Sequence, residues 1–158
     1  MKDKKKSIKP VDLKILKLLQ DQGRITNLKI SQEIGLTPSA TMERVRKLEE
    51  RGFINQYVTL INPENFDFNL TAFVWISTTV PNWDESISEA LLNIAYIQEI
   101  HEVQGQSSYL CKIKTKDVKE LSRLLRDYFG KIGTVSNTQT QIVMRTIKET
   151  PTIDLSQV

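Results

Sequence analysis

A short stretch of the chain combines small and charged residues in an order that suits contact with nucleic acid. Five of them share one helical face and a sixth lies on its flank: Ser39, Ala40, Glu43, Arg46 and Lys47, flanked by Arg44. Small side chains near the start of a helix allow base edges to come close, and cationic ones further along can contact phosphates or guanine. We therefore expect the first three near base edges and the three basic residues at phosphates or guanines. Two alternatives stay open: the face is an ordinary solvated surface, and Arg44 braces the fold.

The neighbouring residues predict the helix that would position this face. Thr37 is a good N-cap, and Pro38 falls at the first helical position, where its missing N–H costs nothing. Gly52 follows the helix, at a position where a left-handed residue is favoured. The opposite face is expected to be buried, and its members are Thr41, Val45 and Leu48, with Met42 at the edge.

Two more helices are predicted before this one. Apolar residues recur at helical spacing between residues 10 and 22, and a shorter helix is expected between its N-cap Thr26 and Gly35. Because only Leu36 separates the second helix from the third, the three together predict a helix-turn-helix unit. The β-branched and aromatic run from 53 to 61 predicts a strand that leaves this unit.

Charge is unevenly distributed along the 158 residues. Residues 1–61 hold 13 Lys and Arg against 7 Asp and Glu, whereas residues 62–158 hold 9 against 12. A basic first part favours polyanion binding there. The four lysines within the first six residues form either a solubilising tail or a DNA-binding arm. A single cysteine and the lack of any apolar run of membrane-spanning length lead us to expect a cytoplasmic protein.

The second part of the chain alternates strand and helix patterns. Strands are expected at 70–80, 97–104, 109–114 and 135–148, and helices at 83–95 and 118–129. This order is the ferredoxin-like βαββαβ arrangement, so the predicted fold class is α+β. The first strand is apolar on both faces, and too little chain remains to cover both, which favours self-association. We expect a helix-turn-helix domain at 1–61, which includes the linker strand, and an oligomerisation domain at 62–158.

Patterns for catalysis or metal binding are weak. His101 is the only histidine, and because it has no Cys or Asp partner at metal-ligand spacing, a structural or partly exposed role is expected. Cys111 alternates with Tyr109 and Ile113, which indicates a buried, inert thiol. The chain has no Gly-rich phosphate loop and no GxSxG motif. We expect no enzyme activity, no cofactor and no metal site.

The order of these segments, from about Val11 to about Glu149, resembles the Lrp/AsnC family of transcriptional regulators. Positions typical of the family are occupied by Arg44, Leu48, Gly52 and Ile54. The family usually has Gly where this chain has Asp67, a residue that also tolerates a left-handed backbone. The resemblance implies a regulator that binds double-stranded DNA, a ferredoxin-like second domain, and homodimers that commonly assemble into octamers.

The resemblance also implies an amino-acid effector site near the middle turn and the last strand of the second domain. The matching candidates here are Gly105, Gln106, Ser107, Ser108, Thr138 and Thr140. The family turn usually carries an aromatic residue and an Asp where this chain has the two serines. The site is therefore expected to prefer a different ligand, to bind weakly or to have lost its effector, and the two threonines are alternatively ordinary strand residues. The alternative functions are a ligand-independent regulator and a small-molecule sensor or assembly module.

Overall fold

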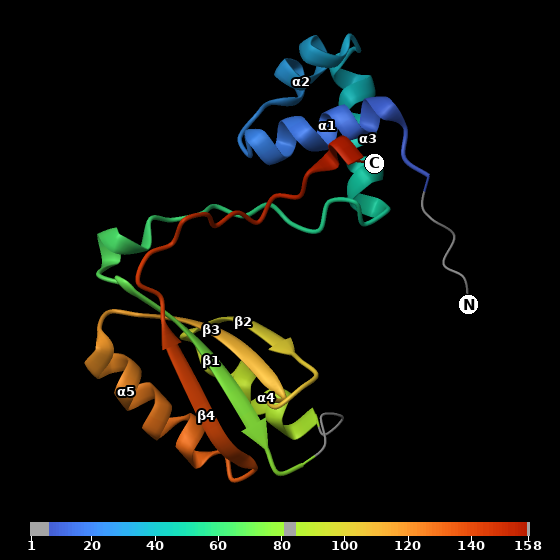
Figure 1. The fold of residues 1–158 in the computed structure, drawn as a ribbon. Helices are drawn as coiled ribbons and strands as arrows, with labels where there is room; N and C mark the ends of the chain where they lie inside the picture. Colours follow the sequence, from blue (N-terminus) through green and yellow to red (C-terminus); the bar gives the residue numbers. More distant parts are fainter. Residues whose placement is uncertain (1–6, 81–84, 158) are drawn as a thin grey trace. The chain divides into compact units, whose positions relative to one another are not determined.

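The computed structural model describes residues 7–80 and 85–157 (Figure 1). Contacts divide the chain into two compact units, one up to Leu60 together with the residues from Thr150 onward, and the other Ile61–Glu149. This division differs from the expected domains, 1–61 and 62–158, because the end of the chain packs with the first unit. The two units are described separately below.

The described part of the first unit contains three α-helices: α1 (Pro10–Asp21), α2 (Asn27–Ile34) and α3 (Pro38–Glu50). Their common core consists of Ile15, Ile30, Val45 and Leu48, each at most 8% exposed. Gly35 ends α2 in the left-handed conformation, with φ of 70°, so that the chain turns directly into α3. The predicted helix-turn-helix is therefore confirmed.

The two ends of α3 follow the sequence signals closely. The Thr37 hydroxyl accepts a hydrogen bond from the backbone N–H of Ala40 at 3.3 Å, and Pro38 occupies the first turn. Gly52 follows the helix with φ of 67°. Thr41 is fully buried, as predicted, and its hydroxyl donates to the carbonyl of Thr37 at 3.0 Å. These contacts fix where α3 begins, and therefore which residues face outward in its first turn.

The strand predicted at 53–61 is wrong, because residues 54–61 form no ladder with any described part of the chain. A β-strand needs a neighbouring backbone to satisfy its amides and carbonyls, and β-branched composition alone does not supply one. The segment leaves its apolar side chains exposed, including Val58 and Leu60. A 2.8 Å hydrogen bond from the Tyr57 hydroxyl to Glu49 holds this segment to α3. Further on, Asp67 adopts a left-handed φ of 64°, as expected at a position where the family usually has Gly.

The second unit is a four-stranded antiparallel sheet with two helices on one face. Its strands are β1 (Leu70–Thr78), β2 (Ile97–Glu102), β3 (Tyr109–Thr115) and β4 (Val135–Ile142), in the order β2-β3-β1-β4. Its helices are α4 (Glu85–Leu92) and α5 (Val118–Asp127). The first two residues of the helix predicted at 83–95 lie outside the described residues. The predicted α+β, ferredoxin-like arrangement is confirmed.

The last strand is shorter than predicted, and its expected extension to 148 is wrong. Ile142 pairs with Ala72, and the next amide, that of Val143, still donates to the carbonyl of Thr71 at 2.9 Å. β1 begins only one residue before Thr71, so no further backbone partner is available on β1. The chain then leaves the sheet edge.

The two faces of β1 have different surroundings. Ala72, Val74 and Ile76 are fully buried against α4 and α5. Phe73 and Trp75 point to the opposite face of the sheet and are half-buried. The expectation of a strand that is apolar on both faces is confirmed, with both helices on the same side.

Candidate nucleic-acid interface and effector region

The outer face of α3 presents its small residues first and its charged residues later. Ser39 and Ala40 are exposed in the first turn, beside the capping Thr37. Glu43, Arg46 and the rest of the charged group follow one to two turns later. The free N–H groups of a first helical turn attract anions, which suits an approach of the DNA backbone to this end. The structure thus places five of the six predicted contact residues on one accessible surface.

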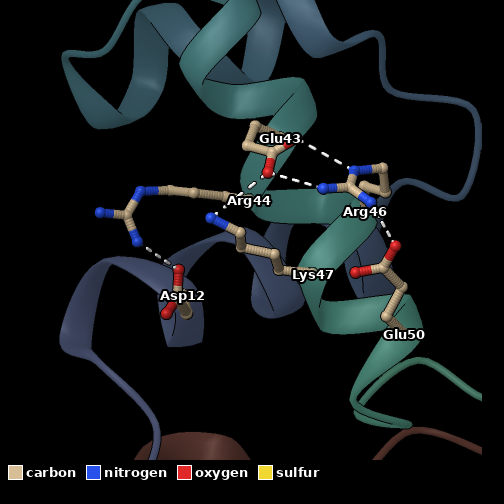
Figure 2. Close-up of polar contacts among 6 residues, drawn as sticks. All are labelled: Asp12, Glu43, Arg44, Arg46, Lys47 and Glu50. Carbon is tan, nitrogen blue, oxygen red and sulfur yellow. Dashed lines mark hydrogen bonds and ion pairs between the residues drawn. The ribbon is translucent and has the colours of Figure 1, made fainter.

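These charged side chains form one network along the helix (Figure 2). Both carboxylate oxygens of Glu43 accept from Arg46, at 3.0 Å from Nε and 2.7 Å from Nη2. Lys47 Nζ lies 3.3 Å from the same carboxylate, and Arg46 also pairs with Glu50. Hydrogen bonding to Arg46, followed by that to Lys47, lowers the pKa of Glu43 to about 2. The pKa of Arg46 is raised, chiefly by its hydrogen bond to Glu43.

The network has a direct consequence for nucleic-acid binding. Two carboxylates face two cations, so this group of four residues has no net charge. All four side chains are about half exposed, and solvent screens exposed ion pairs until they stabilise little. Arg46 and Lys47 can therefore exchange a carboxylate for a phosphate at small cost. Release of Arg46 would free both carboxylate oxygens of Glu43 that accept from it.

Arg44 has a different environment from its neighbours. Its Nη1 lies 2.8 Å from Oδ1 of Asp12 on α1, and the Asp12 side chain is only 8% exposed (Figure 2). Of the two roles open to Arg44, this contact favours bracing α3 against α1. Asp12 lies in the first turn of α1, where a carboxylate also complements the helix dipole. The missed signal was its position three residues before the buried Ile15, where a carboxylate needs a partner.

The contacts of Arg51, directly after α3, were not predicted from the sequence. Arg51 donates from Nη2 to the backbone carbonyl of Ser7 at 2.7 Å, and its guanidinium lies 4.8 Å from the ring centre of Phe53. The helix end is thereby joined to the segment that precedes α1. Stacking of an arginine on a nearby aromatic ring has no periodic sequence pattern, so the sequence could not predict it.

The predicted effector turn packs against the end of β1 through hydroxyl groups. Ser77 Oγ donates to the carbonyl of Gln106 at 3.2 Å and lies 3.4 Å from Ser107 Oγ. Thr78 Oγ1 lies 2.9 Å from Ser108 Oγ. Gly105 opens this turn with φ of 146°, a conformation that side chains rarely adopt. The turn residues are thus brought together with two hydroxyls of β1 that the sequence interpretation did not include.

The structure does not bring the other effector candidates into that cluster. Thr138 pairs with Ile76 and Thr140 pairs with Val74, so both face the helix-covered side of the sheet. They lie on the edge strand β4, and β1 separates them from the turn. The turn therefore contacts the β1 hydroxyls of Ser77 and Thr78 rather than these two threonines.

The two residues considered for catalysis, Cys111 and His101, have different environments. Burial raises the pKa of the Cys111 thiol to about 12, and its side chain is fully buried, as predicted. His101 is exposed, with Nε2 3.4 Å from Glu99. Within residues 7–80 and 85–157, no group of three or more His, Cys, Asp or Glu could hold a metal ion. No helix in the same ranges is long and apolar enough to cross a membrane.

Comparison with known proteins identifies both units. A winged helix-turn-helix DNA-binding model matches residues 8–55, and the Lrp/AsnC ligand binding domain model matches residues 71–153. The chain belongs to the Lrp/AsnC family. It is 36% identical over 146 residues to the leucine-responsive regulatory proteins of Escherichia coli K12 and Klebsiella pneumoniae, which covers 91% of this chain and 89% of theirs.

Solved structures of Lrp/AsnC proteins have the same fold. A transcriptional regulator from Neisseria meningitidis, solved as its L-Met complex, superposes with a TM-score of 0.90 and 27% identity, covering 96% of this chain and 99% of that one. An AsnC family regulator from Agrobacterium tumefaciens gives 0.88 over 95% and 99% of the two chains, at 24% identity, and supports the fold alone. The chain is thus a DNA-binding transcriptional regulator rather than an enzyme, as the sequence predicted.

Proposed function

We propose that this Lrp/AsnC regulator binds double-stranded DNA as a homodimer, in the cytoplasm, and that an amino acid bound to its second unit changes that binding. The observation that carries the proposal is the accessible outer face of α3, with small residues at its capped start and exchangeable cations beyond. In helix-turn-helix proteins the second helix of the motif lies in the major groove, and its first residues contact base edges.

Each residue of this face has a role that follows from its chemistry. Ser39 and Ala40 are small enough to let the helix start approach base edges closely. Glu43 suits the N4 amino group of cytosine, which donates in the major groove. Arg46 and Lys47 would contact phosphates, and each contact releases counterions. Arg44 would support these contacts indirectly, through its ion pair with Asp12.

The uncovered face of the second unit supports self-association. Phe73 and Trp75 lie on the sheet face opposite both helices and are only half-buried. A second copy of the same face would cover them and would relate two recognition helices by a two-fold axis. Half-sites about one DNA turn apart, in a pseudo-palindrome, are then expected. Assembly of such dimers into an octamer is the family arrangement and belongs to this proposal.

The hydroxyl cluster at the turn is the proposed effector region. Its three serines and Thr78 can donate to the carboxylate of an amino acid, and Ser107 and Ser108 contribute no charge of their own. The Neisseria relative is named as an L-Met complex, and the Escherichia relative is named leucine-responsive. Uncharged amino acids such as these are therefore the first ligands to test here.

Selection of genomic fragments tests DNA binding and effector response together. The full-length protein is incubated with sheared genomic DNA, and bound fragments are sequenced with and without methionine, leucine and a mixture of all amino acids. We expect enrichment of fragments that share a two-fold half-site, and an occupancy change with an uncharged amino acid. Enrichment that no amino acid alters would support a ligand-independent regulator. No enrichment, together with no retention on heparin at low salt, would favour the sensor or assembly module.

A further inference from the structure

The end of the chain docks on the DNA-binding unit in a specific way. The side-chain amide of Gln20, near the end of α1, makes two hydrogen bonds with the backbone of Ile153. Its Nε2 donates to the Ile153 carbonyl at 3.2 Å, and its Oε1 accepts from the Ile153 N–H at 3.1 Å. One side chain thus satisfies both backbone groups of Ile153, much as a neighbouring strand would.

Further contacts hold the same segment, residues 150–156, which we call the C-terminal clasp. A cavity is lined on one side by this clasp and on the other by residues of α1, including Leu13 and Lys17. The pKa of Asp154 is lowered, mainly by hydrogen bonds with Ser156, and the charge of Lys17 adds to this effect. The Thr150 and Thr152 hydroxyls lie 2.7 Å apart, and the Thr152 N–H donates to Thr150 Oγ1 at 3.2 Å. The clasp therefore makes specific contacts with α1.

The residue just before the clasp is anchored in the second unit. Glu149 pairs with Lys112 on β3 and lies 4.0 Å from Nζ of Lys114. Lys112 is also paired with Glu99 at 2.9 Å, and its side chain is only 12% exposed. Three residues, 150–152, separate the Glu149 anchor from the Ile153 anchor. The two units are thus joined by the segment before Ile61 and, a second time, by this short one.

We propose that the C-terminal clasp is a second tether that restrains the DNA-binding unit, and that Gln20 is a positioning residue for binding to two DNA half-sites. Gln20 lies on α1 and not on the recognition helix, so its effect acts through the orientation of α3. The hydrogen bonds of Gln20 are neutral and solvent-accessible, which makes the clasp reversible. Two half-sites are bound more tightly when the second helix is already oriented, since less freedom is then lost on binding. This role rests on the proposed two-fold DNA binding, but the restraint itself does not.

Segmental motion tests the restraint without DNA. Cys111 is fully buried, so a Gln32→Cys substitution on the exposed side of α2 allows selective labelling of the full-length protein. We expect time-resolved anisotropy of this label to gain a fast nanosecond component in Gln20→Ala and in a chain that ends at Glu149. Gln22→Ala, an exposed glutamine just past α1, is the matched control and should behave like the parent. Decays that are identical in all four proteins would overturn the restraint.

Duplexes with one or two half-sites, taken from selected genomic fragments, test the positioning role. We expect Gln20→Ala to weaken two-half-site binding by about threefold to tenfold and to leave single-half-site binding unchanged. An equal loss on both duplexes, or no loss on either, would overturn the positioning role. If the parent protein binds neither duplex, the proposed function fails, whereas the anisotropy result still decides whether the clasp restrains the unit. Unchanged thermal unfolding monitored by circular dichroism shows that the variants remain folded.

Discussion

Arg44 and Arg46 lie two residues apart on the same helix, yet the structure gives them opposite environments. Arg44 reaches another helix and pairs with a carboxylate that is almost fully buried. Arg46 pairs with carboxylates of its own helix, in water. A buried carboxylate that loses its cation is costly, whereas an exposed pair exchanges partners readily. The comparison shows that burial of the partner, and not residue type, decides whether an arginine is held within the fold or can exchange its partner.

The largest effect is expected from breaking the buried pair. Arg44→Ala leaves the Asp12 carboxylate without its cation and should lower the free energy of unfolding of the first unit by about 2–3 kcal/mol. Urea denaturation followed by helical circular dichroism measures this change. Asp12→Asn is the milder companion variant, because its amide can still accept one hydrogen bond from Arg44. An Arg44→Ala protein as stable as the parent would remove the bracing role.

Replacing the exposed cations Arg46 and Lys47 should change DNA affinity rather than stability. Replacing Arg46 and Lys47 together by Ala is expected to weaken binding to all DNA sequences while thermal unfolding stays nearly unchanged. The slope of log affinity against log salt should become shallower by about one to two. Titrations at several salt concentrations measure it, with exposed Lys14 replaced by Ala as a control for loss of charge elsewhere. An unchanged slope would count against phosphate contact by this pair.

Replacing Glu43 is expected to have a smaller effect on DNA binding than replacing Arg46 and Lys47. Glu43→Gln removes the charge that holds Arg46 and Lys47, and it also removes an anion from the DNA-facing surface. We expect non-specific DNA affinity to rise by about threefold and discrimination between selected and random duplexes to fall. Competition binding against random DNA gives both quantities. Improved discrimination would contradict a base-reading role for this carboxylate.

The smallest effect concerns pH. Because the folded-state pKa of Glu43 is about 2, below the ordinary value of 4.5, its ion pairs stabilise the helix above about pH 4.5. This contribution is lost as the pH falls from 4.5 towards 2. NMR titration of the Glu43 side-chain carboxyl should give a midpoint near 2, and Arg46→Ala should move it upward. A midpoint near 4.5 in the parent protein would mean that the network does not persist in solution.

Local signals in the sequence were sufficient for the recognition helix. Its capping threonine, first-turn proline and terminal glycine each act within a few residues, so their effects can be recognised without knowledge of the rest of the chain. The same holds for the buried face that contains Thr41 and Leu48. The order of strands and helices in the second unit was predictable because hydrophobic periodicity differs between the two kinds of element.

The sequence by itself therefore determined the family, the order of the helices and of the four sheet strands, and the buried and exposed faces of α3. The tertiary structure alone decided which partners lie across space: Asp12 for Arg44, Lys112 for Glu149, and Gln20 for Ile153. It also decided that the run after Phe53 has no strand partner within residues 7–80 and 85–157, and that β4 ends at Ile142. The physical reason is the same in each case. Strand pairing, ion pairing and docking depend on groups that are distant in sequence, and no local propensity encodes where such a group will lie.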